Sequence, residues 1–95
     1  VLPWLADADA EVVRAAAYVV ARLRAPAGVR GVLAVRGHAD EEVRQHVART
    51  LARGTVGDSL ASAARDALER LLGDPSERVR INAVRSAASF GAVMA

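Results

Sequence analysis

A helix-forming pattern recurs three times along this chain and restricts the possible folds more than any other feature of the sequence. Its best copy spans Asp74–Gly91 and combines a capping acid, an early proline, a Val-Arg pair, an alanine-rich apolar stripe and a terminal glycine. Weaker copies occupy Asp7–Leu23 and His38–Gly54. Repetition of one helical unit indicates an array in which similar helices stack on one another.

The copies are aligned here on their first valine, at Val12, Val43 and Val79, with intervals of 31 and 36 residues. Small or β-branched residues follow at four-residue intervals, as expected where one helix packs closely on the next. A period of this length is typical of a solenoid, in which each helix pair buries its apolar face against its neighbours. The sequence therefore predicts an all-α fold, an α-α superhelix of about five helices in antiparallel pairs.

We interpret residues 1–95 as one repeat domain, a fragment of a longer array, with repeats at about 7–36, 38–72 and an incomplete 74–95. Residues 1–6 and 92–95 are interpreted as parts of further helices. The second helices are expected at 27–36 and 58–72. The first of these contains two glycines, each costing about 1 kcal/mol relative to alanine inside a helix, and its apolar run could also form a strand. Helix is favoured because a lone strand has no pairing partner.

Several local features define the expected helix ends and faces. Asp58 and Asp74 are expected to be N-caps, the latter with Pro75 at the first helical position. Gly54 is expected to end the second copy of the pattern. An i,i+4 ion pair is expected between Asp66 and Arg70. The apolar stripe of the first helix is expected at Val12, Ala16, Val19, Val20 and Leu23.

The composition excludes several classes of protein. Apolar residues make up 53% of the chain but aromatic residues only 3%, so there are few large side chains to line a deep ligand pocket. The absence of cysteine excludes disulfides and thiolate metal sites. No apolar run approaches the roughly 20 residues of a membrane-spanning helix, and the first residues lack the basic region of a signal peptide. We therefore expect no membrane association and a cytoplasmic location.

All thirteen cationic side chains are arginine, against eleven acids, which gives a net charge of +2. One interpretation is a GC-rich coding sequence, which favours arginine codons. The other is a surface that binds phosphate or carboxylate groups, since arginine pairs with both through two hydrogen bonds. The acids are interspersed with the arginines, so no basic block marks a nucleic-acid site.

No constellation of residues with catalytic or metal-binding spacing is found. The one cluster of histidines and acids comprises His38, Asp40, Glu41, Glu42 and His46. It lacks a His-Glu-x-x-His pattern, and acids at a helix start are favoured by the helix dipole without any metal. Serine and threonine residues lie outside any nucleophile motif, and the glycines lack the spacing of a phosphate loop. The sequence predicts no enzyme, no cofactor and no metal site.

The pattern Asp-Pro-Ser-Glu-Arg-Val-Arg-x-x-Ala-x-x-x-Ala-Ala resembles the first helix of a HEAT repeat, and its short period is similar to that of the bacterial HEAT-like repeats of phycobilisome lyases. The resemblance implies a ladder of acid–arginine contacts between successive repeats, to which Asp74 and Arg80 belong. In the second copy Arg44 is retained but His38 replaces the acid. In the first copy Arg14 falls one place late, so a complete ladder is not expected there.

The resemblance also implies that the second helices line a concave surface. The candidate partner-binding residues on these helices are Arg30, Arg36, Arg65, Glu69 and Arg70. The function expected is a non-catalytic scaffold that binds a protein partner or another domain of its own chain. Two alternatives are an array that binds the nucleic-acid backbone and an accessory region of a bacterial lyase or reductase. Uncovered ends of the array would also favour self-association.

Overall fold

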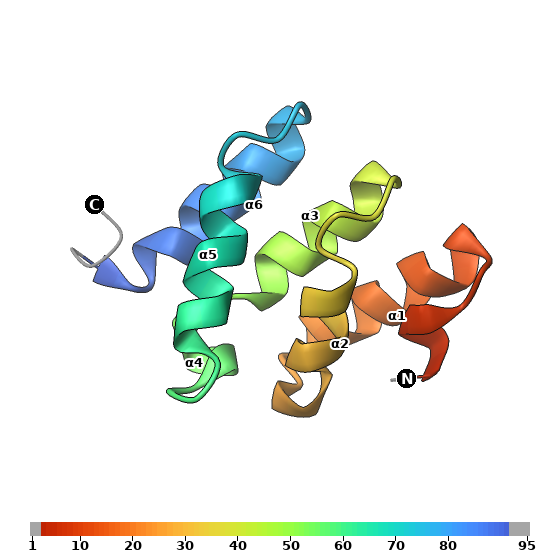
Figure 1. Ribbon diagram of the computed structural model, residues 1–95, viewed down its shortest axis with the longest axis horizontal. Coiled ribbons are helices and arrows are strands. Elements are labelled where there is room, and N and C mark those ends of the chain that lie inside the picture. Colours follow the sequence, from red (N-terminus) through yellow and green to blue (C-terminus); the bar gives the residue numbers. More distant parts are fainter. Residues whose placement is uncertain (1–2, 92–95) are drawn as a thin grey trace.

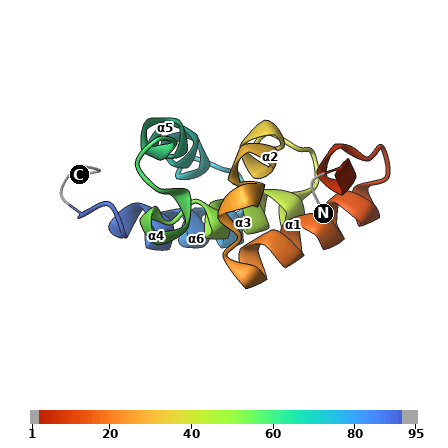
Figure 2. The ribbon, with the colours of Figure 1, turned by 90° about the horizontal axis from the view of Figure 1, so that it is seen from below.

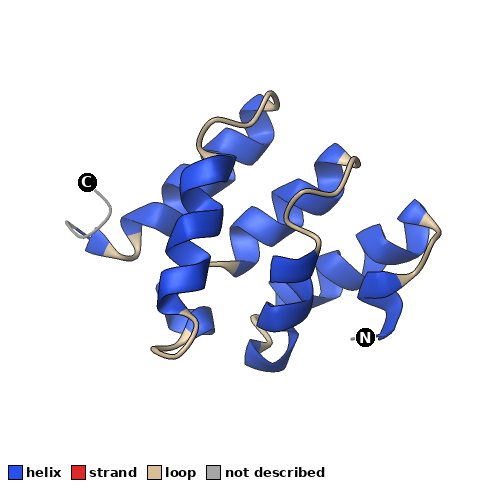
Figure 3. Cartoon of the chain, in the orientation of Figure 1, coloured by secondary structure: helices blue, strands red, loops and turns tan. Residues whose placement is uncertain are grey.

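The computed structural model describes residues 3–91, and every regular element in this range is helical (Figure 3). The elements in chain order are η1 (Pro3–Ala6), α1 (Ala10–Leu23), η2 (Pro26–Gly28), α2 (Val29–Ala34), α3 (Glu41–Thr50), α4 (Arg53–Val56), α5 (Ala61–Leu71) and α6 (Glu77–Ala88). The helix expected at 92–95 lies outside the described residues, as do the first two residues of the segment expected at 1–6.

The helices form two layers (Figure 2). The first layer contains α1, α3 and α6, side by side in that order, and the second contains α2 and α5. The two ends of the described chain lie at opposite ends of the array (Figure 1). The predicted all-α, α-α superhelical fold is therefore confirmed. Six α-helices are present in residues 3–91 instead of about five, because the four-residue helix α4 was not predicted.

Small side chains fill the space between the layers. Ala17, Ala64 and Ala83 are fully buried, and so is Val43. Their size allows the helix backbones to approach closely, since interiors are packed without large voids. The fully or almost fully buried apolar residues are Val13, Ala17, Val20, Val29, Val32, Val43, Val47, Ala48, Leu51, Ala64, Leu68, Val79 and Ala83.

The expected apolar stripe of α1 is confirmed at Ala16 and Val20, which are 3% and 1% exposed, but it is wrong at its two ends. Val13 is 1% exposed and takes the place assigned to Val12, while Leu23 is 69% exposed. The cause is the helix start: Asp9 is the N-cap, and its carboxylate accepts a hydrogen bond from the Glu11 amide. This start sets the helical phase that turns Val13 inward. The equivalent positions are therefore Val13, Val43 and Val79, at intervals of 30 and 36 residues.

The start of α6 also differs from the prediction. Ser76 is the N-cap, and its hydroxyl accepts a 3.4 Å hydrogen bond from the Val79 amide. Asp74 lies two residues earlier, where one carboxylate oxygen accepts a 2.9 Å hydrogen bond from the Ser76 amide. The Asp74 carboxylate also pairs with Arg44 of the preceding repeat.

Two further local predictions are wrong. Gly54 lies inside α4 and does not end α3, which stops before Leu51. Asp58 does not cap α5: the N-cap is Leu60, without a side-chain hydrogen bond, and the Asp58 side chain is fully exposed. Asp58 instead contributes its backbone carbonyl, which accepts from the Ala61 amide and closes the turn before the helix.

Helix is confirmed for the segment in which a strand was the alternative, since α2 follows directly on η2. Gly28 allows this segment to pack against α1. A Cβ atom at Gly28 would lie 2.6 Å and 2.8 Å from the two methyl groups of Val20. Side-chain atoms do not approach so closely, so only glycine fits without a shift of the backbone.

We expect Gly28→Ala to destabilise the fold by about 1–3 kcal/mol, the usual cost of overpacking a well-packed core. Urea denaturation measures this change in the free energy of unfolding. Gly54→Ala is the matched control, because nothing lies within 4 Å of a Cβ at Gly54. A Gly28→Ala variant as stable as the control would contradict the close approach.

Candidate interaction groove

The Arg44 guanidinium connects α3 with the loop that precedes α6. Its Nε donates to Asp74 Oδ2 over 2.8 Å, and its Nη2 donates to Asp74 Oδ1 over 3.2 Å. Its Nη1 donates to the carbonyls of His38 and Ala39, each over 2.9 Å. The side chains of Arg44 and Asp74 are 17% and 7% exposed, so this two-point ion pair is largely shielded from water. Arg44 therefore holds both the loop before its own helix, α3, and the loop before α6.

An equivalent pair connects α1 with α3 and was not expected from the sequence. Arg14 Nη2 donates to Asp40 Oδ2 over 2.8 Å. Asp40 is the N-cap of α3, and its other oxygen accepts from the amides of Glu42 and Val43. The ladder is thus present at both described junctions. In the sequence, the Val-Arg pair in each first helix indicates this ladder, because alignment on Val13 places Arg14 in register with Arg44.

His38 occupies the sequence position of the ladder acid but has a local role. Its ring Nδ1 accepts a 3.0 Å hydrogen bond from the Asp40 amide. Asp74 accepts the equivalent hydrogen bond from the Ser76 amide, two residues ahead. Asp74 thus accepts hydrogen bonds both from an arginine and from an amide of its own loop. In the second repeat two residues make these contacts: His38 accepts from the loop amide, and Asp40 accepts from Arg14.

Arg80 contacts the loop before its helix, α6, in the same way as Arg44 contacts the loop before α3. Its Nη1 donates to the carbonyls of Asp74 and Pro75 over 2.7 Å and 3.1 Å. Within residues 3–91 its guanidinium makes no ion pair with a carboxylate. The predicted ladder role of Arg80 toward a following element is not tested by the structure and stays a prediction.

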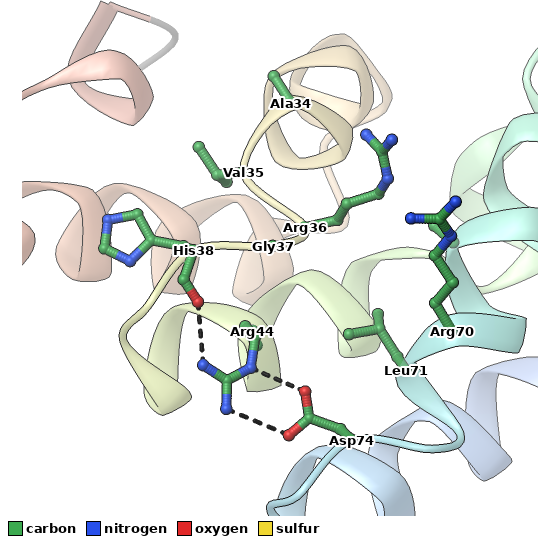
Figure 4. Close-up of a pocket in the computed structure, with 10 residues that line it drawn as sticks. Ala34, Val35, Arg36, Gly37, His38, Arg44, Arg70, Leu71 and Asp74 are labelled. Atoms are coloured by element: carbon green, nitrogen blue, oxygen red, sulfur yellow. Dashed lines mark hydrogen bonds and ion pairs between the residues drawn. The ribbon is translucent and has the colours of Figure 1, made fainter.

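A groove of about 610 Å³ lies between the ends of α2 and α5, above the Arg44–Asp74 pair (Figure 4). Apolar side chains from both helices and the loop after α2 form part of its wall. The lining residues are Ala34, Val35, Arg36, Gly37, His38, Arg44, Ala67, Arg70, Leu71 and Asp74. A smaller hollow of about 250 Å³ shares Arg36, Ala67 and Arg70 with it.

Two arginines line this groove. Arg36 follows α2 and Arg70 lies in the last turn of α5, and Figure 4 shows their guanidinium groups near each other. Arg36 Nη1 donates to the Leu33 carbonyl over 2.8 Å, which leaves its other nitrogens available. Among the residues from 3 to 91, neither guanidinium makes an ion pair with a carboxylate. Two like charges facing each other favour an anion between them.

The predicted ion pair between Asp66 and Arg70 is absent, since neither residue takes part in an ion pair with another residue in the range 3–91. The Arg70 side chain instead extends toward Arg36 (Figure 4). Asp66 and Glu69 line a shallow hollow beside Arg70. The groove therefore has a cationic wall at Arg36 and Arg70 and an acidic rim on the outer side of α5.

The five candidate partner-binding residues do not form one cluster. Arg36 and Arg70 line the same groove, and Glu69 borders it through the hollow beside Arg70. Arg30 is exposed on α2 and Arg65 is half-buried on α5, but neither lines the groove. The structure adds Val35, an apolar wall residue in the loop after α2, which the sequence pattern did not single out.

His46 is the buried titratable group of the first layer. Its ring packs edge-on against Tyr18, with the ring centres 5.4 Å apart. Burial, together with the Arg49 guanidinium 3.3 Å from Nδ1, lowers the pKa of His46 below its usual value, and Glu42 opposes this shift. In the part of the chain that the structure describes, no three histidine or acidic side chains gather as a metal site.

These features define a class of protein, the helical-repeat arrays in which paired helices stack through repeated contacts. Residues 29–95, more than half of the chain, match the family of HEAT repeats, and the chain belongs to this family. Neither a comparison with curated proteins nor one with solved structures found a match. HEAT repeats commonly serve as protein-interaction scaffolds and are generally non-catalytic. None of the helices in the described range has the length and apolarity that a membrane crossing requires.

We expect Asp74→Asn to lower the free energy of unfolding by about 2 kcal/mol near neutral pH, the scale of hydrogen bonds to a charged group. Burial alone would raise the pKa of Asp74, but Arg44 and the Ser76 amide outweigh it and hold the pKa below its usual value. The native carboxylate therefore contributes stability above about pH 4 that is lost as the pH falls further.

Urea denaturation between about pH 3 and pH 7 checks both the loss and its pH dependence. Asp58→Asn is the control, because the Asp58 side chain is fully exposed. An Asp74→Asn variant whose stability fell with acid as steeply as the native chain would argue against the role of the carboxylate.

His46 produces a separate pH effect, because its pKa is lowered in the folded chain. The unfolded chain then binds a proton more readily, so stability is complete above about pH 6.5 and declines below it. We expect His46→Gln to flatten this part of the stability profile, as measured by thermal melts across the range. A profile unchanged by the substitution would assign the decline to other groups.

Proposed function

We propose that this chain is a non-catalytic interaction module whose α2–α5 groove binds an acidic segment of a protein partner or of another domain. The observation that carries the proposal is the pair of guanidinium groups of Arg36 and Arg70, which line one groove and make no ion pair within residues 3–91. A carboxylate placed between them would receive hydrogen bonds from both sides.

The rest of the groove supports a peptide as the ligand. Val35, Ala67 and Leu71 give an apolar wall against which the aliphatic part of a segment packs. Arg44 adds no net charge there, because Asp74 neutralises it. The groove therefore favours a ligand with one or two carboxylates beside apolar side chains.

The acidic rim argues against the nucleic-acid alternative. Asp66 and Glu69 line a hollow together with Arg70. A surface that follows a backbone needs cations along its length, and here opposite charges alternate. A protein ligand with a short acidic segment fits the two arginines and avoids the rim.

We expect a fluorescein-labelled peptide of alternating leucine and glutamate to bind the chain, with affinity that falls as salt is added. Arg36→Glu combined with Arg70→Glu should weaken this binding about tenfold or more, since hydrogen bonds to charged groups contribute about 1.5–3 kcal/mol each. Fluorescence anisotropy measures both. Arg30→Glu is the matched control, because Arg30 is exposed on α2 outside the groove.

Equal loss in the control and in the double variant would assign the binding to general charge attraction. A labelled DNA duplex is the competing ligand in the same assay. If the duplex binds and the peptide does not, the nucleic-acid alternative replaces the proposal.

A further inference from the structure

A second hollow, of about 570 Å³, lies in the first helix layer, among residues of α1, α3, α4 and α6 and the turns that follow them. The central helix, α3, packs against both α1 and α6, so the hollow lies across two helix junctions. None of its lining residues also lines the groove between α2 and α5. Its polar lining includes Arg24, Arg49, Thr55, Asn82, Arg85 and Ser89.

Three arginines line this hollow, and no acidic residue of the described range lines it with them. Arg24, Arg49 and Arg85 are exposed, and within residues 3–91 none of them makes an ion pair with a carboxylate. Arg49 Nη1 lies 3.3 Å from the ring Nδ1 of His46, which carries no negative charge. Like charges gathered in one hollow repel one another, and a bound anion offsets this repulsion.

The repeat places two of these arginines in equivalent positions. Arg49 and Arg85 each lie six residues after the register valine of their helix, Val43 and Val79. Because α3 and α6 pack against each other, equivalent positions of the two helices are neighbours. The stacking of two described helices therefore brings these two cations to one place.

Arg24 occupies a backbone position that disfavours a side chain. It is the C-cap of α1, with φ 50° and ψ 49°, and its amide donates to the carbonyls of Val20 and Ala21. Glycine is the usual residue at a left-handed helix end. Among the described residues, Arg24 is the one residue other than glycine with a positive φ. An arginine retained in a strained conformation beside a hollow supports a binding role for its side chain.

Hydrogen bonds between helices hold the wall of the hollow without using the arginines. The Ser89 hydroxyl oxygen accepts a 2.8 Å hydrogen bond from the Arg53 amide at the start of α4. The Ser86 hydroxyl of α6 donates to the Ala48 carbonyl of α3. The backbone that carries Arg49 and Arg85 is thus positioned before a ligand arrives, which lowers the cost of binding.

We propose that this hollow binds a phosphate monoester, the group present on phosphorylated side chains and at the ends of nucleotides. At neutral pH this group carries a charge of about −1.5 to −2 and three acceptor oxygens, which suits three guanidinium groups without a competing acid. A carboxylate or a backbone phosphodiester carries one charge and balances the three arginines less well. This inference does not depend on the groove between α2 and α5.

The test compares four ligands by ¹H–¹⁵N NMR titration at constant ionic strength. They are a Gly-Ser peptide with one phosphoserine, the same peptide without phosphate, adenosine monophosphate, and a thymidine oligonucleotide without a terminal phosphate. We expect a phosphate monoester to bind with a dissociation constant below about 10 mM and to shift the signals of Arg24, Thr55 and Arg85. The tighter of the phosphopeptide and the nucleotide identifies the source of the group.

Arg49→Gln combined with Arg85→Gln should weaken this binding about tenfold or more. Arg30→Gln combined with Arg65→Gln removes the same charge outside the hollow and should leave binding unchanged. Circular dichroism checks that both variants fold, and the signals that shift in the native chain locate the site without any variant.

The proposal is overturned if neither monoester binds, or if the unphosphorylated peptide or the oligonucleotide binds as tightly. Equal loss in the two double variants would assign the binding to net charge. Loss of binding in Arg36→Gln combined with Arg70→Gln would place the phosphate in the α2–α5 groove and would also overturn the proposal.

Discussion

The guanidinium of Arg44 holds together three segments that no regular backbone pairing connects: α3, the loop before it and the loop before α6. Helix pairs in such an array meet only their neighbours, so each junction must fix its own geometry. Arg44 does this with hydrogen bonds from three of its nitrogens, while Asp74 satisfies both the arginine and a backbone amide. The loops at the helix starts are thereby fixed relative to the helices.

Close helix packing depends on this arrangement and on the small residues between the layers. Alanine and valine at the contact positions allow the helix backbones to lie near one another. At Gly28 the absence of a Cβ atom avoids a clash with Val20 of α1. The consequence for function lies at the ends of α2 and α5. There Arg36 and Arg70 line one groove, next to the Arg44–Asp74 pair.

Repetition also explains why the ends of the array differ from its middle. A position such as Ala48 is buried because another helix follows it, whereas Val84, in the same register, is largely exposed. The same holds for Arg44 and Arg80, of which the first has a carboxylate partner and the second has only carbonyl partners within the described residues. Equivalent residues thus differ in burial and in hydrogen-bond partners according to whether a described helix packs against them.

The sequence alone determined the helical class and the repeat. These features are encoded in windows of about one helix, where periodicity sets which residues face inward. The tertiary structure decided which atoms meet. Arg14 and Asp40 are 26 residues apart, and a shift of one residue in α1 would turn Arg14 away. Similarly, Arg44 and Asp74 are 30 residues apart, and Arg36 and Arg70 line one groove only because two helices from different repeats lie side by side.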